Sequence, residues 1–97
     1  MDIKDLRLEI DAIDQELVKL FCQRMEVAAK IADYKREQGL PICHPGREQE
    51  VLQKVTSLAG EKHGKYIRSI YEVIFELSKE YQLRYMEQME NCSEVIL

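Results

Sequence analysis

Apolar residues recur at alternating three- and four-residue steps through the first third of the chain. This spacing places them on one stripe of a helix, and such a stripe is normally buried against other helices. One position of the stripe, Arg24, carries a charge instead. A buried guanidinium costs several kcal/mol unless it is paired and hydrogen-bonded, so we expect Arg24 to have an anionic partner in the protein or in a ligand. The apolar members are Ile3, Leu6, Ile10, Ile13, Leu17, Leu20, Val27, Ile31 and Tyr34.

The stripe predicts a long first helix that runs from Asp2, its N-cap, to about Gln38. Gly39 supplies a left-handed stop and Pro41 prevents continuation. A helix of about 36 residues extends about 54 Å, whereas a compact domain of this size has a diameter of roughly 32 Å. We therefore expect a second copy of the chain to cover the part of the stripe that overhangs.

Two further helices are predicted in the rest of the chain. Pro45 suits the first position of a short helix that ends at Gly60. Residues 61–64 are typical of a turn, and a third helix of medium length is predicted from Lys65 to about Met89.

We assign residues 1–90 to one helical domain and expect residues 91–97 to form a loose tail, because the tail carries no capped periodic pattern. The predicted fold class is all-α, with one long N-terminal helix, one short helix and one medium helix. We expect these helices to intertwine with those of a second copy in a homodimer.

Composition excludes several classes of protein. The chain has 97 residues, 45% of them hydrophobic and 33% charged, which suits one small globular domain rather than a membrane protein. No signal-peptide core is present, so we expect a cytoplasmic location. A net charge of −4 without a dense basic cluster argues against a nucleic-acid partner. Three cysteines without CxxC spacing argue against a disulfide framework or a zinc site, and we expect no metal and no cofactor.

Two cations share one face of the first helix. Lys35 lies eleven residues after Arg24, which is three turns and a small rotation, so the two are about 16 Å apart. A small anion could lie between them. Arg7 is about 25 Å from Arg24, too far to hold the same small ligand within one chain. In an antiparallel or crossed dimer, Arg7 of one copy could approach Arg24 of the other.

A series of residues at characteristic separations extends from about Ile3 to Tyr85. It comprises Leu6-Arg7, Ile10-Asp11-Ala12-Ile13-Asp14, Leu17, Leu20, Arg24, Ala28, Ile31, Lys35, Pro41-Ile42, Pro45, Arg47-Glu48, Ser78 and Gln82. Each motif is weak by itself. In this order and at these separations, the set resembles the all-helical chorismate mutase family.

The resemblance implies an enzyme, a monofunctional chorismate mutase that converts chorismate to prephenate on the route to phenylalanine and tyrosine. It implies a three-helix protomer and two active sites per dimer, each built mostly by one chain. It assigns catalysis to Lys35, Gln82 and Arg24. It assigns substrate binding to the same three residues and to Arg7 from the second copy, the backbone of His44, Arg47, Glu48 and Ser78.

The resemblance also implies a role for each group. Arg24, with Arg7 of the other copy, would bind carboxylates, and Ser78 would support one of them. Lys35 would contact a carboxylate and the ether oxygen, to which Gln82 would also donate. The ring hydroxyl would be held by Glu48 and the backbone of His44. Arg47 would orient its neighbours and reinforce the positive field.

The chemistry of this reaction fits the residues. A [3,3] rearrangement needs no nucleophile or metal; it needs a flexible substrate held in a compact chair and donors where charge develops. Lys35 and Gln82 would stabilise negative charge on the ether oxygen more in the transition state than in the ground state.

One departure and several alternatives accompany this hypothesis. His44 stands where the family usually has Asp, a stronger N-cap, so we expect the start of the second helix to lose up to about 1 kcal/mol. Arg24 could instead be a structural arginine paired with Glu48, and Lys35 a solvated lysine. The alternative functions are an isochorismate pyruvate lyase of the same architecture and a non-catalytic helical dimerisation module.

Overall fold

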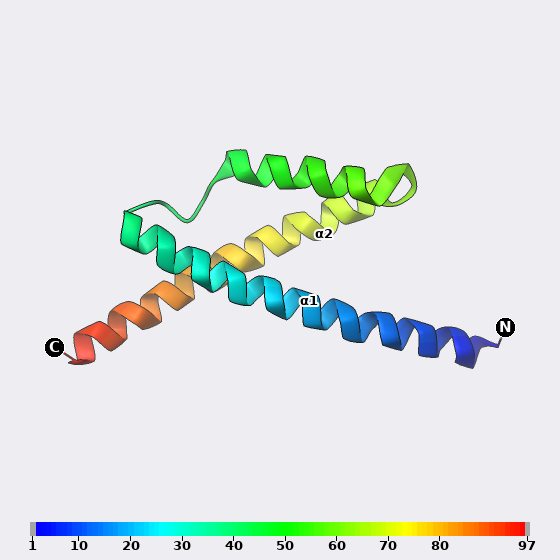
Figure 1. Cartoon of the computed structure of the whole chain (residues 1–97), viewed down its shortest axis with the longest axis horizontal. Helices are drawn as coiled ribbons and strands as arrows, with labels where there is room; N and C mark the ends of the chain where they lie inside the picture. The colour runs from blue at the N-terminus through cyan, green and yellow to red at the C-terminus, as the bar shows by residue number, and fades with distance from the viewer. Residues whose placement is uncertain (1, 97) are drawn as a thin grey trace.

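The computed structural model describes the backbone of residues 2–96 and the side chains of residues 2–87. Over these residues the chain is all-α. Helix α1 spans Ile3–Gln38 and helix α2 spans Pro45–Ile96, and residues 39–44 connect them (Figure 1). The predicted loose tail, residues 91–97, stays a prediction, because its side chains and Leu97 lie outside the described residues.

The ends of α1 lie where the sequence predicts them. Asp2 occupies the N-cap position, although its side chain makes no capping hydrogen bond. Its carbonyl instead accepts hydrogen bonds from the N–H groups of Asp5 and Leu6, at 3.1 and 3.2 Å. At the other end Gly39 has φ 67°, the left-handed conformation that glycine adopts without steric cost and that stops the helix.

The prediction of three helices is wrong, because residues 2–96 form two. The expected turn at residues 61–64 is helical, and α2 departs from helical dihedral angles only at Gly60, with φ 81° and ψ 175°. This combination is open essentially only to glycine, so one residue changes the direction of the chain. Figure 1 shows α2 folding back on itself there. We call residues 45–59 the first limb of α2 and residues 61–96 its second limb.

A second glycine lets the two limbs meet closely. Gly64 is buried, and a Cβ atom added to it would lie 3.1 Å from Cγ2 of Thr56. The limbs therefore pack against each other immediately after the reversal, which a larger residue at position 64 would disturb.

Small side chains hold α1 against the second limb of α2. Ala28, Ala29 and Ala32 are buried on α1, and the short side chains allow a close approach of the two backbones. Phe75 and Leu52 complete the buried apolar set.

Hydrogen bonds also join α1 to the second limb of α2 where the two helices cross. Gln82 Nε2 donates to the Ala28 carbonyl at 2.9 Å, and the Tyr85 hydroxyl donates to Asp33 Oδ2 at 3.0 Å. The Asp33 carboxylate, with a contribution from burial, raises the pKa of Tyr85, so this hydroxyl stays protonated as a donor.

The molecule is long and thin, with principal extents of 62, 30 and 15 Å. Figure 1 shows the N-terminal part of α1 extending away from the rest of the chain. The predicted apolar stripe is exposed there: Ile10, Ile13, Leu17 and Leu20 each expose 56–59% of their surface. The expected overhang of the first helix is thus confirmed. Within the described residues, neither helix contains a stretch long and apolar enough to cross a membrane.

Candidate active site

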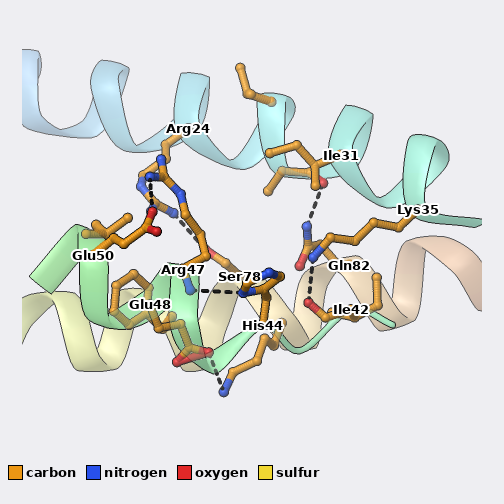
Figure 2. A pocket seen from close by; sticks show the side chains of 15 residues that line it. Arg24, Ile31, Lys35, Ile42, His44, Arg47, Glu48, Glu50, Ser78 and Gln82 are labelled. Atoms are coloured by element: carbon orange, nitrogen blue, oxygen red, sulfur yellow. Dashed lines mark hydrogen bonds and ion pairs between the residues drawn. The ribbon is translucent and has the colours of Figure 1, made fainter. Parts of the chain in front are cut away.

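A cavity of about 650 Å³ opens between α1, the connector and both limbs of α2. Seven of the eight predicted site residues line it, and Figure 2 labels all seven: Arg24, Lys35, His44, Arg47, Glu48, Ser78 and Gln82. The eighth, Arg7, is exposed on the overhanging part of α1 and does not line the cavity. Residues more than 50 positions apart in sequence therefore meet at one site.

Arg24 reaches this cavity from α1. Its Nη1 atom donates to Ser78 Oγ at 3.2 Å, and its guanidinium carbon lies 5.7 Å from the ring centroid of Tyr71 and 6.0 Å from that of Phe75. These contacts orient a half-buried cation without neutralising it. No ion pair among the described residues involves Arg24, so the alternative of a structural pair with Glu48 is not supported.

Lys35 is the second cation of the cavity for which the described residues provide no ion pair. Its Nζ donates to the Ile42 carbonyl at 2.8 Å, which fastens the connector to α1 (Figure 2). An ammonium group has three donors, so this hydrogen bond leaves donors that a ligand can use.

Two buried polar side chains come from the second limb of α2. Ser78 and Gln82 expose only 8% and 7% of their surface. The bond from Gln82 to the Ala28 carbonyl uses one of its two amide N–H groups and fixes the plane of the amide. Polar groups on an otherwise apolar stripe thus serve both the helix crossing and the cavity.

His44 begins α2 as its N-cap. Its Nδ1 atom accepts a hydrogen bond from the Arg47 N–H at 2.9 Å, and its carbonyl accepts one from the Glu48 N–H at 3.1 Å. The imidazole therefore makes the capping bond that we did not expect from histidine. Because Arg47 and Glu48 follow directly, the cap also sets where these two side chains leave the helix.

The two carboxylates of the cavity both have cationic partners. Arg47 Nη1 lies 3.3 Å from Glu50 Oε2, in an exposed pair. Glu48 Oε2 lies 3.5 Å from Lys79 Nζ, in a pair whose side chains are 27% and 26% exposed. The positive charges of Arg24 and Lys35 are therefore the ones left for a ligand, and two such charges, three turns apart on α1, suit a dicarboxylate.

The sequence analysis missed Lys79 and the apolar wall that Phe75 contributes. The signal was present, since Phe75, Lys79 and Gln82 follow one another at four- and three-residue steps on one helix face. Lys79 also lies 3.0 Å from Glu76 Oε1. The hydrogen bond to Glu76 and the negative charge of Glu48 raise the pKa of Lys79 despite its partial burial, so it is a cation.

Comparison with known proteins shows the family to which the chain belongs. The family described as chorismate mutase type II matches residues 6–83 of this chain. The chain belongs to the chorismate mutase type II family. The family match spans every residue that lines the cavity.

Individual relatives show how far this similarity extends. The chain is 29% identical over 91 residues to the chorismate mutase of Methanocaldococcus jannaschii, with 92% of each protein covered. It is 40% identical over 78 residues to the T-protein of Haemophilus influenzae, covering 80% of this chain but 20% of that protein. The structure of a chorismate mutase from Thermus thermophilus superposes with a TM-score of 0.79 at 31% identity, covering 84% of this chain and 94% of that one.

Proposed function

We propose that this chain is an isomerase that rearranges chorismate to prephenate. The observation that carries the proposal is Arg24, a half-buried cation in the cavity that bonds to Ser78 and has no carboxylate partner among the described residues. Such a group is costly unless an anion binds to it. Membership of the chorismate mutase type II family identifies which anion is meant.

Binding would do part of the catalytic work. Chorismate is a flexible dicarboxylate, and its rearrangement requires a chair in which the two reacting carbons approach each other. Arg24 and Lys35 enter the cavity from the same face of α1, and holding one carboxylate each would restrict the substrate to compact shapes. Such positioning lowers the barrier, because conformational freedom is lost when the substrate binds rather than when it reaches the transition state.

Electrostatic stabilisation would do the rest. As the C–O bond breaks ahead of C–C bond formation, negative charge grows on the ether oxygen. Lys35 and Gln82 each keep an N–H donor that is not used in the helix packing. Donation to the ether oxygen strengthens with the charge, so these groups stabilise the transition state more than the substrate.

Glu48 would receive the ring hydroxyl. The hydroxyl is a hydrogen-bond donor on a substrate that otherwise offers acceptors, and Glu48 is a half-buried carboxylate that lines the cavity. We assign the backbone of His44 beside it as a second contact. Arg47 borders the same region and adds positive charge.

We further propose that the enzyme is a homodimer in which the second copy completes each site with its Arg7. The exposed stripe on α1 supports this, because apolar residues that expose more than half of their surface along several turns are normally covered by another helix. The position of Arg7 on the same overhanging part of α1 would carry it into the other copy's site.

The test is the identity of the product. Purified protein incubated with chorismate should yield prephenate, detected by NMR or chromatography. Pyruvate released faster from isochorismate would show a lyase instead. If neither substrate reacted and a bicyclic dicarboxylate mimic of the transition state failed to raise the melting temperature, the chain would be a non-catalytic dimerisation module.

A further inference from the structure

We propose that Lys79 determines specificity: through its ion pair with Glu48, it makes the cavity favour a neutral hydroxyl over an ammonium group at the same position of the substrate ring. This inference rests on the proposed function, because it takes Glu48 as the partner of the ring hydroxyl. It concerns a residue that none of the predicted site positions includes.

The geometry places Lys79 beside the group that it would control. It follows Ser78 on the second limb of α2, and its Nζ lies 3.5 Å from Oε2 of Glu48 on the first limb. Glu76, one turn earlier, lies 3.0 Å from the same Nζ and is largely exposed. Lys79 is therefore held between a solvated carboxylate and the carboxylate of the cavity.

The charge state of this pair decides what Glu48 can bind. An ionised carboxylate has about four lone-pair positions, so Glu48 can accept a hydroxyl hydrogen bond while it remains paired with Lys79. A hydroxyl needs only such an acceptor. An ammonium group needs net negative charge, and the ion pair with Lys79 already offsets part of the charge of Glu48.

An incoming ammonium would also meet like charge. Lys79 would be its immediate neighbour, and Arg24, Lys35 and Arg47 also line the cavity. The other carboxylate, Glu50, is paired with Arg47. Lys79 and the other cations that line the cavity thus oppose a second cation at the ring, and the repulsion is strongest at a few Å and in a partly desolvated site.

The experiment compares two substrates in the Lys79→Met variant and the parent. One substrate is chorismate, and the other is its analogue in which an amine, protonated at neutral pH, replaces the ring hydroxyl. Removing Lys79 should reduce the preference for the hydroxyl substrate in kcat/KM by about tenfold or more, because Glu48 regains an unneutralised charge. Turnover of chorismate should change by no more than about threefold, since its hydroxyl keeps its acceptor.

Two variants serve as controls. Lys79→Arg keeps the positive charge and should keep the parent's preference. Lys62→Met removes an exposed lysine of α2 that does not line the cavity and should leave both reactions unchanged. Circular dichroism melting establishes that each variant is folded, and Lys79→Gln replaces Lys79→Met if the latter does not fold.

Failure of this inference is distinguishable from failure of the proposed function. An active Lys79→Met variant with an unchanged preference would overturn the role of Lys79 alone. Absence of prephenate from the parent would overturn the proposed function. In that case the same preference is measured from thermal stabilisation by ring-hydroxyl and ring-ammonium dicarboxylates, and equal ratios in parent and variant would contradict the inference.

Discussion

Arg24 and Lys35 are the cavity cations that no described carboxylate neutralises, so we expect their removal to slow the reaction itself. We expect Arg24→Ala and Lys35→Ala each to lower kcat/KM by at least about 10²- to 10³-fold, the usual cost of one donor to developing charge. The measurement is steady-state loss of chorismate absorbance. Arg84→Ala, which removes an exposed arginine paired with Glu80, should retain full activity. Near-normal activity in either cavity variant would refute the role of that residue.

Gln82 gives a prediction about pH. A neutral amide donates at any ordinary pH, whereas a carboxylate at this position must first be protonated before it can donate. Gln82→Glu should therefore shift the activity profile toward acidic pH. Gln53→Glu, on the exposed face of α2, should reproduce the parent's profile. A parental profile for Gln82→Glu would place this side chain away from the ether oxygen.

His44 can be tested through the stability of the fold. His44→Ala removes the hydrogen bond to the Arg47 N–H and should lower the free energy of unfolding by about 1 kcal/mol. His44→Asp should restore it. Denaturant unfolding of the parent and the two variants measures the effect, and equal stability of all three proteins would show that the cap contributes nothing.

Single residues differ in how well the sequence predicts them. Arg24 is visible because a charge interrupts an apolar stripe, and the other predicted residues are visible through their joint spacing. The sequence places Lys79 on the helix face of Gln82, but it does not show the ion pair with Glu48, which lies 31 positions earlier on the other limb of α2. A pair formed by tertiary packing leaves no periodic signal. The capping bond of His44 was missed for a different reason, since average N-cap preferences do not describe one imidazole rotamer.

At the level of helices, the reversal of α2 depends on Gly60. Its φ of 81° and ψ of 175° are strained for any residue with a Cβ atom. Gly60→Ala should lower the free energy of unfolding by about 1 to 3 kcal/mol. Gly46→Ala is the matched control, because Gly46 has no positive φ and alanine favours a helix. Thermal or urea unfolding compares the two, and a Gly60→Ala variant as stable as the parent would contradict the assigned conformation.

The same segment explains why the number of helices was predicted wrongly. Residues 61–64 have the composition of a turn, and local propensity alone favours a loop there. In the structure the reversal is completed at Gly60, and the chain is helical again from residue 61, with Gly64 packed close to Thr56. By contrast, the end of α1 at Gly39 depends on local signals, and there the prediction was correct.

For the whole molecule, the overhang of α1 followed from comparing the length of the apolar stripe with the size of a compact domain. The 62 Å extent and the exposed residues on this part of α1 agree with that comparison. The structure of one chain leaves Arg7 outside the cavity. Active sites shared between two copies therefore remain a prediction. They require Arg7 and Arg24 to come from different copies, whereas a self-sufficient subunit would not.

Co-refolding two inactive variants tests directly whether each active site combines residues from both copies. Arg7→Ala and Arg24→Ala homodimers should each be nearly inactive, because every site lacks one cation. In a mixed dimer, the site built on the Arg7→Ala chain keeps its own Arg24 and receives Arg7 from the other copy. An equal mixture should therefore recover about a quarter of the parent's activity. No recovery above the separate variants, or full activity of Arg7→Ala by itself, would contradict a site built from two chains.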